Sequence, residues 1–119
     1  DGYDEPDWPA DRAPRFIRAP RLARLDTYRN PELELVERCT LLVIDEVGAG
    51  DVGSVDRWAE RLDAIVSGRY DAALDTVLTT NLTRDEFRKA FGERLYDRVA
   101  GSGGTWEEFA GPSLRGGGR

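Results

Sequence analysis

Two adjacent carboxylates follow the most apolar stretch of the sequence. Residues 41–44 (LLVI) are an unbroken aliphatic run, and Asp45 and Glu46 come directly after it. Such a run predicts a parallel strand buried on both faces. In nucleotide hydrolysis, one acid at the end of such a strand holds the shell of a magnesium ion, and a second orients or deprotonates the attacking water. Two acids that end a strand in solvent explain the same residues equally well.

An amide follows the next apolar segment. Residues 76–80 (TVLTT) are β-branched or apolar and stop at Asn81, which predicts a second buried strand. Ligands of open α/β sheets bind at the carboxyl ends of strands, so Asn81 and Glu46 would face one water if the two strands are neighbours. Taken alone, Asn81 is more simply the start of a turn.

Arginines supply a third group of candidates. Late in the chain they occur in GERLYDRV at 92–99 and in GPSLR at 111–115. An arginine beside a γ-phosphate stabilises charge that develops during transfer, and a neighbouring subunit can supply it. Arg98 is the candidate for this role. The alternative is that Arg94 and Arg98 are solvated helix charges paired with Glu93 or Asp97.

A second set of arginines recurs every third residue early in the chain. The positions are 15, 18, 21 and 24. Arginines along a helix can follow the phosphates of single-stranded DNA, and Arg18, Arg21 and Arg24 are the candidates. An ordinary solvated helix face has the same spacing.

Hydrophobic spacing predicts the elements that position these side chains. The first half of the chain predicts a short strand at 16–17, a helix through residues 22–28 that Asn30 and Pro31 break, and a further helix that Pro31 begins. A helix over 55–70 follows from four apolar residues at 3.6-residue spacing, with Ser54 as its cap and Gly68 near its end. Thr83 and Glu86 form a capping box for an amphipathic segment up to residue 99, and residues 105–109 are expected to be a last strand.

Composition limits the possible classes of protein. A chain of 119 residues with 39% hydrophobic residues predicts one folded domain, and the alternation of expected strands and helices predicts an α/β domain with a mostly parallel sheet. Residues 1–14 form a flexible acidic lead-in, residues 15–115 the domain and residues 116–119 a glycine-rich tail. The lead-in carries most of the net charge of −6, so bulk charge gives no sign of a nucleic-acid binder.

One cysteine, Cys39, and no histidine exclude disulfide frameworks, Cys/His zinc sites and His-dependent triads. Without an apolar run of about 18 residues or a signal peptide, we expect a cytoplasmic protein with no membrane partner.

The order of the motifs resembles one known family. VIDEVG, a helix ending in RY, then TTNL, GERLYDRV and GPSLR are similar, over about residues 15 to 116, to the C-terminal half of AAA+ ATPases of the DnaC/IstB type. The resemblance implies that Asp45 and Glu46 are the Walker B acids, with Asp45 holding Mg²⁺ through water. It also implies that Asn81 is the sensor-1 residue, Arg98 the arginine finger and Arg115 the sensor-2 arginine.

The same resemblance implies a fold, cofactors and partners. The fold would be the three-layer P-loop NTPase fold with a sheet ordered 5-1-4-3-2. ATP and Mg²⁺ would bind between subunits of a homo-oligomer. The family loads a replicative DNA helicase onto single-stranded DNA or assists a transposase, and it places extra helices that face single-stranded DNA near the early arginines.

The sequence departs from this family at the phosphate-binding loop. No G-x-x-x-x-G-K-[ST] string is present, and the only lysine is Lys89. The first strand and the loop are therefore missing from the expected fold, the last strand should lose its partner, and the chain alone should be inactive. Gly48, Gly50 and Gly53 spell a dinucleotide fingerprint, but the two acids before them would repel a pyrophosphate. The interpretations left open are a helicase-loader ATPase, an IstB-like transposition helper, and a non-catalytic adaptor that has lost the loop.

Overall fold

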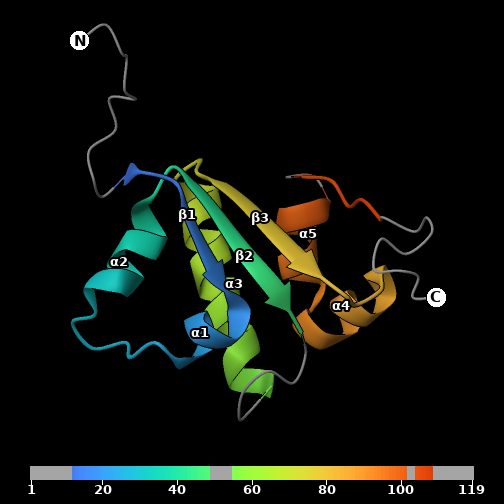
Figure 1. Ribbon diagram of the computed structural model, residues 1–119. Helices are drawn as coiled ribbons and strands as arrows, with labels where there is room; N and C mark the ends of the chain where they lie inside the picture. The colour runs from blue at the N-terminus through green and yellow to red at the C-terminus, as the bar shows by residue number, and fades with distance from the viewer. Residues whose placement is uncertain (1–11, 49–54, 102–103, 109–119) are drawn as a thin grey trace, which may run out of the picture.

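Three parallel strands form the sheet at the centre of the molecule (Figure 1). A computed structural model describes residues 12–48, 55–101 and 104–108. Strands β1 (Arg15–Arg18), β2 (Leu41–Val47) and β3 (Asp75–Thr80) lie in the order β1-β2-β3, and both pairings are parallel. The prediction of an α/β domain with a parallel sheet is confirmed in this part of the chain.

Helices make the crossover connections that parallel strands require. Helices α1 (Ala19–Arg24) and α2 (Pro31–Arg38) connect β1 to β2, and α3 (Val55–Asp71) leads back from the carboxyl end of β2 to β3. Helices α4 (Arg84–Phe91) and α5 (Glu93–Ala100) follow β3 and lie beside it in Figure 1.

Local capping signals determine where several helices begin and end. Asn30 accepts hydrogen bonds from the N–H groups of Glu32 and Leu33 at the start of α2, and Pro31 occupies the first turn as predicted. The predicted capping box of Thr83 at the start of α4 is confirmed. Helix α1 is shorter than its apolar spacing predicts. It ends at Arg24 because the next residue is already extended, with φ −62° and ψ 135°.

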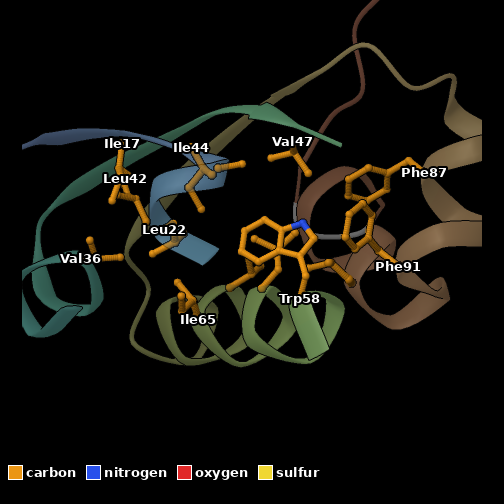
Figure 2. Packing of buried hydrophobic residues seen from close by; sticks show 14 of the residues in the cluster. Ile17, Leu22, Val36, Leu42, Ile44, Val47, Trp58, Ile65, Phe87 and Phe91 are labelled. Atoms are coloured by element: carbon orange, nitrogen blue, oxygen red, sulfur yellow. The ribbon is translucent and has the colours of Figure 1, made fainter. Parts of the chain in front are cut away.

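A single apolar cluster fills the space between one face of the sheet and the helices (Figure 2). Strand residues Ile17, Leu42 and Ile44 point toward α3, which contributes Trp58 and Leu62. Burial of each large side chain contributes about 1.5–3 kcal/mol relative to exposure. The helix over 55–70 and the short strand at 16–17 are confirmed, whereas the proposed cap Ser54 lies outside the described residues.

The opposite face of the sheet is only partly covered by the described residues. Phe16, Val43 and Val77 lie side by side in register across the three strands, and the exposed fractions of Phe16 and Val77 are 64% and 46%. The prediction that β2 is buried on both faces is therefore wrong in the described part of the chain, and β3, predicted as a buried strand, has no fully buried residue. Burial alternates along both strands, because all the buried apolar side chains of the sheet belong to the one cluster.

The segment after α5 does not form the expected last strand. Residues 104–108 have no regular secondary structure, and residue 109 lies outside the described part. Trp106 packs on Phe87 and Tyr96 instead, with ring centroids 5.7 and 6.2 Å apart. The predicted lead-in up to residue 11 and the tail at 116–119 also lie outside the described residues. No helix in the described ranges has the length and apolarity needed to cross a membrane.

Candidate functional site

An irregularity in β2 sets the geometry of the carboxylate pair. The register of β2 against β3 shifts between Ile44 and Val47, and Glu46 has a φ of 64°. This is the left-handed region, which residues other than glycine rarely adopt. The hydroxyl of Thr80 donates a hydrogen bond to the Val47 carbonyl and accepts one from the Leu82 N–H at 3.1 Å. The strand therefore ends in a bulge that β3 holds in place.

The hydroxyl of Thr79 connects the two candidate acids. Thr79 Oγ1 donates a hydrogen bond to Asp45 Oδ1 and accepts one from the backbone N–H of Glu46 at 3.0 Å. Asp45 is half-buried, whereas Glu46 is exposed. One side chain of β3 thus fixes a carboxylate and the adjacent backbone of β2.

The Glu46 carboxylate and Asn81 lie on different sides of β2. Glu46 Oε1 is 3.6 Å from Nη1 of Arg18 on β1, whereas Asn81 follows Thr80 at the end of β3, on the other side of β2. The carboxyl ends of parallel strands meet at one edge, so Asp45, Glu46 and Asn81 share that edge as predicted. The Glu46 and Arg18 side chains are 54% and 64% exposed. Such a pair contributes at most about 1 kcal/mol. That Glu46 and Asn81 face one water stays a prediction.

Asp45 supplies a half-buried carboxylate at this edge. Mg²⁺ keeps several waters and is bound through one or two carboxylates together with substrate phosphates. The described residues contain no group of three or more acidic, cysteine or histidine side chains placed to hold a metal ion. The role of Asp45 as a contact for Mg²⁺ through water therefore stays a prediction. These residues do not define a position for ATP, because the sequence has no phosphate-binding loop.

Arg98 lies at the other end of the sheet. Its Nε donates a hydrogen bond to the Ser67 hydroxyl at 3.0 Å, and its guanidinium lies 4.9 Å from the ring centroid of Tyr70. Both partners are in the last turns of α3, which leads into the amino end of β3. Arg98 is therefore not near Asp45 in the same chain. It is also not the simple solvated charge of the alternative, whereas Arg94 forms a surface ion pair with Asp63 at 3.4 Å.

The predicted sensor-2 arginine, Arg115, lies outside the described residues, as do Gly50 and Gly53 of the glycine motif. Gly48 is described, and its carbonyl accepts a hydrogen bond from Trp58 Nε1 at 3.2 Å. The site at the carboxyl edge therefore consists of the acid pair, Thr79 and Asn81.

The early arginines differ in their contacts. Arg21 forms a two-point ion pair with Glu32, with Nε 3.1 Å from Oε2, and this pairing raises the pKa of Arg21. Arg18 lies near Glu46, and Arg24 is exposed in the last turn of α1. Only Arg21 and Arg24 are in the helix, so the three do not form one continuous helical stripe.

A groove of about 740 Å³ follows the outer edge of β3. All six residues of β3 line it, together with Arg98, Val99 and Trp106. Strand β3 pairs with β2 on one side, and in the described sheet it has no strand partner on the other side. The groove therefore lies where another strand could pair with the backbone of β3.

Sequence reasoning missed Arg69, which is 1% exposed. Its guanidinium donates hydrogen bonds to the carbonyls of Val36, Cys39 and Asp75 and to the hydroxyl of Thr76, at distances between 2.6 and 3.0 Å. Burial lowers the pKa of Arg69. A signal was present, because residue 69 continues the core-facing helical spacing of residues 62, 65 and 66. Arg69 ties the C-terminal end of α2 to the start of β3 and lies away from the carboxyl edge.

Comparisons with known proteins add no identification. No known family model matches the chain, and no curated protein matches its sequence.

Proposed function

We propose that these residues are the carboxylate half of an ATP-hydrolysing site in a protein like the DnaC/IstB-type AAA+ ATPases. The observation that carries the proposal is the edge at which β2 and β3 end. There Thr79 binds Asp45 and the backbone of Glu46, and Asn81 ends the neighbouring strand. Bound nucleotide and Mg²⁺ would supply the phosphates and the Lewis acid. In this role Asp45 orients the magnesium waters, and Glu46 and Asn81 orient the attacking water.

The sheet topology supports this assignment. The order β1-β2-β3 of parallel strands is compatible with the 2-3-4 part of the sheet order 5-1-4-3-2. In that order the first strand lies between the fourth and the fifth, which corresponds here to the outer edge of β3. The groove beside β3 is a suitable place for it. A complete protein of this class would bring that strand together with the phosphate-binding loop.

Two subunits are needed for Arg98 to take part. Because Arg98 lies beside the end of α3, it can act only on the nucleotide of a neighbouring subunit, as an arginine supplied in trans does. The proposal therefore includes a homo-oligomer. Its partners would be a replicative helicase or a transposase in the cytoplasm, and single-stranded DNA near the early arginines. The ion pair of Arg21 with Glu32 weighs against Arg21 as a phosphate contact.

A non-catalytic adaptor is the competing proposal. The exposed row of Phe16 and Val77 on the open face of the sheet favours it, because exposed apolar surface marks contact sites. The coding DNA before Asp1 separates the two proposals. An in-frame G-x-x-x-x-G-K-[ST] sequence supports the ATPase, and a start codon directly before Asp1 supports the adaptor. A neighbouring transposase gene, as opposed to replication genes, would indicate the transposition helper.

Glu46→Gln in the complete protein tests the catalytic assignment. The substitution keeps the size of the side chain and removes its ability to accept a proton, so we expect ATP turnover to fall by at least about 100-fold while ATP binding is retained. Glu60→Gln, an exposed residue of α3, is the matched control and should leave turnover unchanged. Both rates are measured by phosphate release, and binding is measured by calorimetry. Turnover by the Glu46→Gln protein at the control rate would remove Glu46 from the mechanism.

A further inference from the structure

We propose that Thr79 is a positioning residue that holds both acids of the site through its single hydroxyl. The inference rests on the proposed function, in which Asp45 and Glu46 act at the carboxyl edge. Thr79 was not among the side chains that the sequence assigned to the site.

The hydroxyl of Thr79 uses both of its hydrogen-bonding roles. A threonine hydroxyl has one proton to donate and lone pairs that accept. Thr79 donates to Asp45 Oδ1 and accepts from the Glu46 N–H at 3.0 Å. Hydrogen bonds to a carboxylate are stronger than those between neutral groups. The first bond limits the rotation of the Asp45 carboxylate, and the second fixes the backbone from which the Glu46 side chain leaves the strand.

The second bond falls on a residue whose backbone is left-handed. A residue with a Cβ at a φ of 64° is held there by its surroundings. Thr79 and Thr80 share this task from the two faces of β3. Thr79 holds the Asp45 and Glu46 part of the bulge, and Thr80 holds the Val47 carbonyl and the Leu82 N–H. The two threonines therefore act on different atoms of the same bulge and can be tested separately.

Substitutions that remove only the hydroxyl test the geometry in the 119-residue chain. Thr79→Val keeps the shape of the side chain, Thr79→Ser keeps the hydroxyl, and Thr80→Val is the matched control on the neighbouring residue. With isotope-labelled protein, we expect Thr79→Val to speed amide hydrogen exchange at Glu46 by roughly two- to tenfold and to shift the carboxyl ¹³C resonance of Asp45. Thr79→Ser should restore both signals. Thr80→Val should instead speed exchange at Leu82.

The functional part of the inference is tested in the complete protein. Thr79→Val should lower the kcat of ATP hydrolysis with little change in KM, and Thr79→Ser should recover most of it. Hydrolysis that is unchanged in Thr79→Val would overturn the positioning role. So would exchange at Glu46 that responds equally to Thr79→Val and Thr80→Val. A wild-type protein that hydrolyses no ATP would refute the proposed function. Amide exchange at Glu46 and the carboxyl ¹³C resonance of Asp45 would still show whether Thr79 holds the two acids.

Discussion

Replacing Arg69 by methionine removes a buried guanidinium and keeps an unbranched side chain in its place. Arg69 donates to the carbonyls of Val36, Cys39 and Asp75, and the Nη–O distances are 3.0, 2.8 and 2.6 Å. The first two acceptors lie at the C-terminal end of α2, where helix carbonyls have no partner within the helix. Methionine provides no donor for them, so in the Arg69→Met protein the Cys39 and Asp75 carbonyls lose this partner and the Val36 carbonyl keeps only the weak Cys39 thiol donor at 3.7 Å.

The expected loss follows from these acceptors. A buried acceptor left without its partner costs about 1–3 kcal/mol. The lowered pKa of Arg69 indicates that burying its charge is unfavourable, and methionine removes that penalty. We therefore take the lower end for each carbonyl and expect unfolding free energy to fall by about 3 kcal/mol. Against a typical total of about 5–15 kcal/mol, this lowers Tm on the order of 15 °C for a domain of this size.

Urea denaturation followed by circular dichroism and tryptophan fluorescence measures this change. Arg21→Met is the control, since Arg21 is exposed and solvent screens its ion pair with Glu32. Arg69→Lys should lie between the two, because one ammonium cannot reach all the acceptors of a planar guanidinium. An Arg69→Met protein as stable as the Arg21→Met protein would refute the idea that these hydrogen bonds hold α2 to the sheet.

A pair of glycine substitutions and a labelling experiment on the cysteine test the fold. Gly92 joins α4 to α5 with φ 95° and ψ 162°. An alanine Cβ at this position would meet no atom within 4 Å, so the expected effect of Gly92→Ala comes from backbone strain alone. We expect the substitution to lower the free energy of unfolding by about 1–3 kcal/mol. Gly68→Ala inside α3 is the opposite control and should raise stability by about 0.5–1 kcal/mol; equal effects of both would contradict this reasoning. The Cys39 thiol is fully buried, so a thiol reagent should label it only as fast as the protein opens, and rapid labelling of the native chain would show that its site is open.

Local signals in the sequence predicted most of the elements. The Asn30 and Pro31 pair, the capping box of Thr83 and the β-branched run before Asn81 each depend on residues close together in the chain. Such signals depend on residues within one helical turn or one strand, so the structures that they predict do not require particular tertiary contacts. The length of α1 was overestimated because Leu25 and Tyr28 have helical spacing but are not in the helix, and Tyr28 is exposed.

Features that depend on contacts between distant residues were not predictable. The apolar run of β2 was expected to be covered on both faces, yet coverage depends on which other segments pack there. The bulge at Glu46 depends on Thr79, which lies 33 residues later in the sequence. Arg69 forms its hydrogen bonds to segments that precede and follow its helix. In each case the sequence gives the residue types, and the partners are decided by the tertiary fold.

The position of Arg98 limits how the candidate site can work. Helix α3 begins near the carboxyl end of β2 and runs back along the sheet. Ser67, the hydrogen-bond partner of Arg98, lies twelve residues after Val55, which is about 18 Å along the helix axis. An arginine must be in direct contact with a γ-phosphate to stabilise its charge. One chain therefore cannot place Arg98 and the Asp45 and Glu46 pair on the same nucleotide, and any catalytic role for Arg98 requires that two subunits meet at the site.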